Sequence, residues 1–65
     1  MIYSEILYEI MQKYHFSQEQ LAKRLDVNQT TVGQWLRGIK KPSYDSILAI
    51  YREFGVTPNE LFGIE

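Results

Sequence analysis

One short stretch of the sequence, QTTVGQWLR, carries most of the side chains that could recognise another molecule. Its polar groups are amides, hydroxyls and a guanidinium, which donate or accept hydrogen bonds. At about 100° per residue, Thr30, Gln34 and Arg37 lie on one side of a helix, and Gln29 and Gly33 flank them. The stretch therefore predicts a helix whose exposed side offers hydrogen bonds and one positive charge to a partner.

The other side of this predicted helix is apolar. Val32, Trp35 and Leu36 recur at i, i+3 and i+4, a spacing typical of a buried face. Asn28 precedes the helix as an N-cap, and Gly38 supplies the left-handed residue that ends it. A core behind the helix is thus expected to hold its polar side outward.

A second short helix comes directly before the first. Ser17 and Gln20 form an S-x-x-Q capping box, in which each side chain satisfies the free N–H of the other residue. Asp26 follows as a residue that tolerates turn conformations, and Val27 as an apolar plug. The apolar residues of this helix recur at helical spacing and form its inner face: Leu21, Ala22 and Leu25. The pattern indicates two short helices joined by a tight turn.

Three more helices are expected, one before this pair and two after it. Residues 2–14 have a wide apolar face, made of Tyr3, Leu7, Ile10 and Tyr14 with Ile6 and Met11. Ser43 caps a fourth helix that Gly55 ends, with an apolar stripe of Ile47, Ile50, Tyr51 and Phe54. Thr57, Pro58 and Glu60 begin a short fifth helix that ends at Gly63. With no strand signal, residues 1–65 predict a single all-α domain.

The composition excludes several classes of function. The chain has 65 residues, and its hydrophobic content of 45% is enough for one small core. It has no cysteine, so neither disulfides nor a thiolate metal site can stabilise that core. His15 is the only histidine and has no partner for a metal or catalytic site, so neither a metal, a cofactor nor an enzymatic activity is expected. No membrane span or signal peptide is evident, and a cytoplasmic location is expected.

The charge is distributed unevenly. A net charge of −1 argues at first against a nucleic-acid partner, because DNA affinity depends on phosphate neutralisation. Residues 11–42, however, hold six Lys and Arg residues against two acidic ones, a local charge of +4, whereas residues 1–10 contribute −2 and residues 43–65 contribute −3. The positive part coincides with the two central helices.

Most of the chain resembles the helix-turn-helix domains of the phage Cro and cI repressor family. The resemblance is carried by the ordered series S-Q-E-Q-L-A-x-x-L-x-V-N-Q-T-T-V-x-x-W-x-x-G, followed by K-K-P-S and by I-L-x-I-Y-x-x-F-G-V-T-P-N-E-L-F-G. The resemblance runs from about Leu7 to Gly63. It implies a five-helix, lambda-repressor-like DNA-binding domain with a central helix-turn-helix. The second helix of the motif, about Gln29 to Arg37, would enter the major groove of double-stranded DNA.

Position by position, the resemblance implies roles for ten residues. Those expected to read base edges are Gln29, Thr30 and Gln34. Those expected to contact the DNA backbone are Gln18, Asn28, Thr31, Arg37, Lys40, Lys41 and Ser43. Such domains usually act as homodimers on two-fold operators with half-sites about one helical turn apart. Candidates for the dimer surface are Ile2, Tyr8, Phe62 and Ile64, with the core as an equal alternative for Phe62.

The sequence departs from the family pattern at three places. Met11 and Leu36 replace an arginine and a glutamate that pair in many relatives, and we expect the two apolar side chains to touch instead. Gly33 replaces a larger residue on the DNA-facing side; it either lets the helix approach the groove closely or reflects drift at a tolerant position. Asp26 replaces the usual glycine of the turn, which leaves the turn geometry open.

These observations predict a sequence-specific DNA-binding domain of a transcriptional regulator, with a repressor favoured. The alternative is a module of the same fold that binds a protein, such as a toxin or another regulator, and no longer binds DNA. The near-neutral net charge and Gly33 favour the alternative slightly. A library of random duplexes distinguishes the two hypotheses, because only the first predicts that a DNA sequence is enriched.

Overall fold

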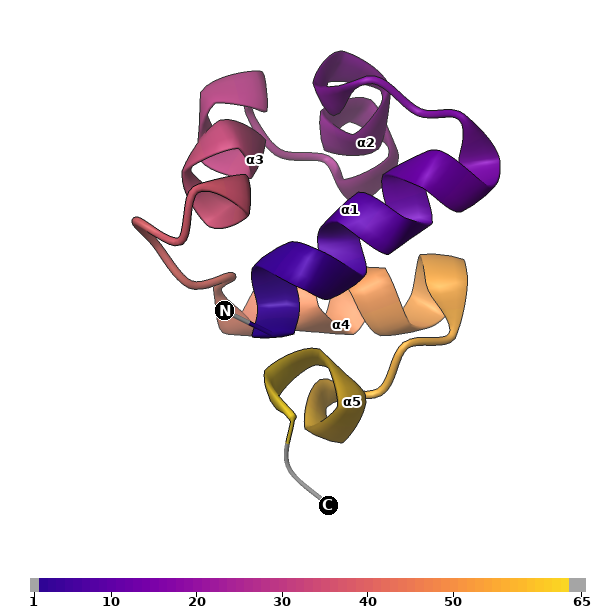
Figure 1. Cartoon of the computed structure of the whole chain (residues 1–65), viewed down its shortest axis with the longest axis vertical. Coiled ribbons are helices and arrows are strands. Elements are labelled where there is room, and N and C mark those ends of the chain that lie inside the picture. The colour runs from indigo at the N-terminus through magenta and orange to yellow at the C-terminus, as the bar shows by residue number, and fades with distance from the viewer. Residues whose placement is uncertain (1, 64–65) are drawn as a thin grey trace.

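The computed structural model describes residues 2–63, and it contains five helices and no strand within that range. The helices are α1 (Ile2–Tyr14), α2 (Gln18–Leu25), α3 (Gln29–Leu36), α4 (Tyr44–Phe54) and α5 (Pro58–Phe62). Figure 1 shows α2 and α3 together at one end of the molecule and α5 at the other, with α1 crossing between them. The predicted all-α fold with five helices is confirmed.

Two helices begin with the capping boxes that the sequence predicts. At the start of α2, the Ser17 hydroxyl accepts the N–H of Gln20 at 3.2 Å, and the Gln20 side chain accepts the N–H of Ser17 at 2.7 Å. Thr57 and Glu60 make the same reciprocal pair at the start of α5, with both distances 3.2 Å. Such caps contribute about 1 kcal/mol each, which matters for helices this short.

The turns between the first three helices use left-handed residues. His15 (φ 57°) follows α1, and Asp26 (φ 58°) ends α2. Asp26 donates its N–H to Lys23 O at 3.2 Å, and Val27 donates to Ala22 O at 2.9 Å. Asp26 therefore takes the conformation that glycine takes in relatives, because a short polar side chain tolerates this region better than most.

The core receives side chains from all five helices. Six side chains are fully buried: Leu7, Leu21, Val32, Trp35, Ile50 and Leu61. The pairs in closest contact are α2 with α3, α1 with α3, α1 with α5, α2 with α4, and α4 with α5. The centre of the Phe62 ring lies 6.0 Å from that of Tyr3, and Phe62 is half-buried against the core, which fits the core alternative that the sequence left open beside the dimer surface. Ile64 and the side chain of Ile2, also proposed there, lie outside the described part.

Two tyrosines that were expected on apolar stripes are exposed. The prediction that Tyr51 is part of the core is wrong: it is 51% exposed on α4, whereas Ile50 is buried. The centre of the Tyr14 ring lies 5.3 Å from the centre of the Phe54 ring, but Tyr14 remains 42% exposed. Both lie at the edges of their stripes, where a phenol can contact apolar neighbours and keep its hydroxyl in water.

The end of α3 also differs slightly from the prediction. α3 ends at Leu36, one residue before the expected end, and Arg37 is its C-cap with φ −88°. Gly38 then takes the left-handed conformation, and Ile39 donates its N–H to Gln34 O at 2.9 Å. Gly38 therefore stops the helix as expected, with the cap one position earlier.

The substitution of an ion pair by Met11 and Leu36 fits the packing. Leu36 is buried, and Met11 is partly buried against the same core. Neither side chain is exposed to solvent, which fits the replacement of an ion pair by apolar packing. That the two side chains touch stays a prediction.

Candidate nucleic-acid interface

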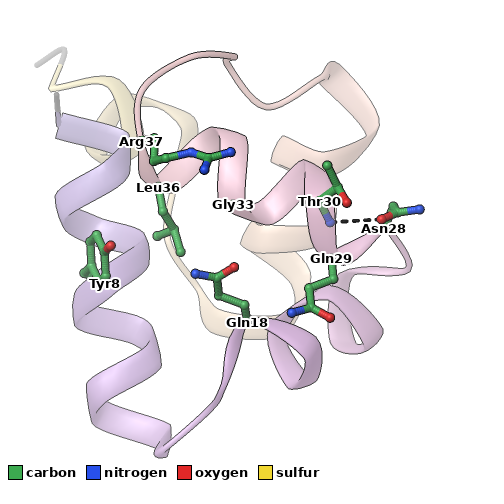
Figure 2. Close-up of a pocket in the computed structure, with 8 residues that line it drawn as sticks. All are labelled: Tyr8, Gln18, Asn28, Gln29, Thr30, Gly33, Leu36 and Arg37. Carbon is green, nitrogen blue, oxygen red and sulfur yellow. Dashed lines mark hydrogen bonds between the residues drawn. The ribbon is translucent and has the colours of Figure 1, made fainter.

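An open groove lies between α1, the start of α2 and the exposed side of α3. Its volume is about 520 Å³. Figure 2 shows the residues that line it, which are Tyr8, Gln18, Asn28, Gln29, Thr30, Gly33, Leu36 and Arg37. Five of the residues predicted to touch DNA are thus brought together on one surface, from two helices and the turn between them.

The first turn of α3 presents its polar groups to solvent. Asn28 caps the helix: its side-chain oxygen accepts the N–H of Thr30 at 2.9 Å, which leaves the side-chain NH₂ free to donate (Figure 2). Gln29 and Thr30 are exposed, and the buried faces of Val32 and Trp35 fix the rotation of the helix behind them. Donors and acceptors are therefore held outward on a helix that cannot turn over.

Gln18 reaches from α2 onto α3. A Cβ atom placed on Gly33 would lie 3.4 Å from Gln18 Oε1, so the glutamine side chain lies directly over the bare backbone of Gly33. Gln18 is half-buried as a result, although it is polar and begins its helix. The amide would be at ordinary contact distance from a Cβ atom at this position, so the glycine is not required for the placement of Gln18.

α1 forms the other wall of the groove, which sequence reasoning missed. The buried Ser4 hydroxyl donates to Trp35 O at 2.7 Å and ties α1 to the end of α3. Tyr8 stands one turn later on the same side of α1 and is 49% exposed. The sequence offered it as one candidate for the dimer surface, and that stays a prediction. The signal that could have placed it beside α3 was its spacing from Met11, at the ion-pair position of the family pattern.

Five of the predicted DNA contacts lie outside the groove lining. Thr31 and Gln34 are half-buried on α3, and Lys40 and Lys41 are exposed in the loop that follows it. Ser43 is exposed, but its hydroxyl accepts the N–H of Ser46 at 3.3 Å as the cap of α4. Its predicted contact with the DNA backbone would have to share the hydroxyl with this cap.

The positive charge of the central segment is only partly available on this side. Arg24 pairs with Glu53 of α4 at 2.9 Å, and Lys23 lies 3.8 Å from Glu19 on its own helix. Arg37 is exposed at the edge of the groove. Lys40 and Lys41 are exposed in the loop that follows α3, outside the groove lining.

Residues 2–63 contain neither a candidate metal site nor a candidate membrane-spanning helix. No group of three or more His, Asp or Glu side chains there could hold a metal ion. No helix in the same range is long and apolar enough to cross a membrane.

The capped helix pair, the tight turn and the exposed polar side of α3 define a small all-helical helix-turn-helix domain. A model of the family described as Helix-turn-helix matches residues 7–61, and the chain belongs to this family of DNA-binding regulatory domains. A similar curated protein is the HTH-type transcriptional activator BcrR of Enterococcus faecalis, which is 34% identical over 65 residues. The match covers 100% of this chain and 32% of that protein. No solved structure matches the chain.

Proposed function

We propose that the chain is a sequence-specific, double-stranded DNA-binding domain of a transcriptional regulator, with α3 in the major groove. One observation carries the proposal. The groove gathers the amide of Gln18, the first turn of α3 and the guanidinium of Arg37 on a single exposed face. Membership of the helix-turn-helix family and the likeness to a named transcriptional activator support it.

The chemistry of these side chains matches DNA. A glutamine amide can pair with N6 and N7 of adenine, and a threonine can bond a base or place its methyl group on thymine. Gln29, Thr30 and Gln34 are the side chains that we assign to base edges. Arg37, Lys40 and Lys41, with the polar groups of Gln18, Asn28, Thr31 and Ser43, are assigned to phosphates, which position a domain without reading sequence.

We expect the domain to act as a homodimer, and the structure offers one exposed face for it. Tyr44, Leu48 and Tyr51 form an apolar row along α4, with exposures of 74%, 37% and 51%. Asp45 and Arg52 stand beside this row at opposite ends. If two copies of α4 pack antiparallel about a two-fold axis, each Asp45 faces the partner's Arg52, so the face is complementary to itself.

The direction of regulation stays a prediction. The family resemblance favours a repressor, whereas the similar protein of Enterococcus faecalis is named an activator. A cytoplasmic location is likewise proposed, as the compartment in which a regulator of this kind meets DNA.

Selection of bound duplexes from a random DNA library at moderate salt tests the proposal. Enrichment of one motif is expected, and a two-fold motif would show binding as a dimer. If the folded protein enriches nothing even at low ionic strength, DNA reading is refuted. The module that binds a protein then becomes the better hypothesis.

A further inference from the structure

Gly33 leaves the floor of the groove without a side chain. The amide of Gln18 lies over one side of it, at 3.4 Å from the site of a Cβ atom, and the remainder of the groove is open (Figure 2). Glycine inside a helix costs about 1 kcal/mol relative to alanine. A bare floor on the exposed side of α3 therefore has a cost, and close approach of another molecule is a physical reason for it.

Tyr8 lines the groove from α1, and in the view of Figure 2 the Leu36 side chain lies between it and Gly33. α1 is fixed relative to α3 by the buried bond from Ser4 to Trp35 O, so the Tyr8 hydroxyl is carried on a rigid support. A residue held beside the groove and 49% exposed is free to donate a hydrogen bond to a ligand. Gln18 and Arg37 also line the groove, and both can donate hydrogen bonds.

The chemistry of the lining favours an anion. None of the eight lining residues is acidic, and Arg37 contributes a positive charge. The lining residues that carry polar side chains can all donate a hydrogen bond: Tyr8, Gln18, Asn28, Gln29, Thr30 and Arg37. These donors and the guanidinium of Arg37 fit a phosphate group, whose charged oxygens accept hydrogen bonds.

We propose that the groove takes a single phosphodiester of the DNA strand that borders α3, and that Tyr8 donates a hydrogen bond to it from α1. The inference rests on the proposed function, since docking α3 in the major groove brings one sugar–phosphate strand past the elements packed beside that helix. Gly33 is the floor against which the strand lies. Tyr8 is then a backbone contact, and the domain grips DNA from three helices.

The first test replaces Tyr8 with phenylalanine, which removes only the hydroxyl. Tyr14→Phe is the matched control, because Tyr14 lies on the same helix, is 42% exposed, and packs against Phe54 away from the groove. Losing a hydrogen bond to a charged acceptor should weaken DNA binding about tenfold for Tyr8→Phe, by a similar factor on specific and unrelated sequences. The salt dependence should stay unchanged, since no charge is removed.

A double-mutant cycle then identifies the phosphate. Duplexes carrying one neutral methylphosphonate linkage at successive positions are bound to both proteins. At one linkage the wild type should lose affinity while Tyr8→Phe loses no more, because the bond is already gone. Additive losses at every linkage would overturn the proposal, and so would a change in base preference in Tyr8→Phe, which would mean that the tyrosine reads a base.

The floor is tested with two substitutions of similar helix propensity. Both Gly33→Ala and Gly33→Leu should raise the melting temperature. Alanine adds a methyl group at ordinary contact distance from Gln18, so binding should stay within about twofold of the wild type. Leucine fills the groove and should weaken binding at least tenfold on all sequences. Equal binding by the two variants would refute the role of Gly33.

Loss of DNA recognition and loss of the Tyr8 contact give different results in these experiments. If the wild type selects no DNA sequence, the proposed function itself is refuted. If the wild type selects a motif but Tyr8→Phe binds every duplex as tightly as the wild type, only the contact from α1 is refuted.

Discussion

Gln29 and Thr30 occupy the part of α3 that is freest to contact another molecule. They are exposed in the first turn, and Asn28 holds this turn in place by accepting the N–H of Thr30. Gln34, assigned the same role, is half-buried one turn later and lies outside the groove lining. A substitution of Gln29 therefore tests base reading more directly than a substitution of Gln34.

Gln29→Ala should lower the affinity for the selected sequence by roughly 1 to 3 kcal/mol and leave binding to unrelated DNA nearly unchanged. The physical reason is that an amide paired with a base distinguishes that base from the other three. Competition binding with specific and unrelated duplexes measures it. Asn59→Ala removes an exposed amide from α5 and should change neither affinity. An equal loss on all sequences would remove Gln29 from the base-reading set.

Local bonds and backbone conformation determine where the elements end. The two capping boxes and the left-handed turns are made by residues close together in the sequence, which explains why the helix bounds were predicted within one residue. Two of these turns place a residue with a side chain in a conformation that suits glycine better, His15 at φ 57° and Asp26 at φ 58°. The turns on both sides of α2 therefore contain local strain.

Asp26→Gly and His15→Gly should each raise the free energy of unfolding by about 0.5 to 1 kcal/mol. Relief of the left-handed conformation gains about 1 to 2 kcal/mol, and the greater freedom of glycine in the unfolded chain offsets about 0.5 to 1 kcal/mol of it. Urea denaturation measures the change. Arg37→Gly is the control: its φ of −88° suits any residue, so only the entropic loss should appear. Destabilisation by all three substitutions would contradict the prediction.

The exposed apolar row of α4 is the face through which we expect two copies of the domain to pair. If two copies pair antiparallel through it, Arg52→Glu places carboxylates opposite each other at both ends and should raise the dimer dissociation constant roughly tenfold or more. The double variant Asp45→Arg, Arg52→Glu restores opposite charges and should restore the dimer. Sedimentation equilibrium over a range of concentrations measures both. Self-association that is the same in the single variant, the double variant and the wild type would exclude this face.

In the whole molecule, part of the positive charge of residues 11–42 is engaged in contacts with other side chains. Arg24 is paired with Glu53, and Lys13 lies 5.6 Å from the ring of Tyr14. Exposed cations lie at the end of α3 and in the next loop. A net charge of −1 is therefore compatible with DNA binding, because affinity depends on the charges that meet phosphates.

Lys41→Ala should weaken binding to specific and unrelated DNA alike and should lower the slope of log affinity against log salt by about one unit. Fluorescence anisotropy at several salt concentrations measures the slope. Lys13→Ala removes the same charge from the last turn of α1 and should leave the slope unchanged. If the two variants behave alike, affinity reflects net charge and not a localised contact.

The sequence by itself determined the helices, their caps and the polar side of α3, because these depend on neighbouring residues and on the period of the helix. It also determined the family, since an ordered series of residues over most of the chain carries the resemblance. It placed Tyr51 in the core, because a period gives the direction of a side chain on its helix and not the neighbour that it meets. Only the tertiary structure brought Tyr8, Gln18 and Gly33 to one groove, by packing α1 and α2 against α3. Contacts between residues distant in the chain depend on how the helices pack, and no local pattern contains that information.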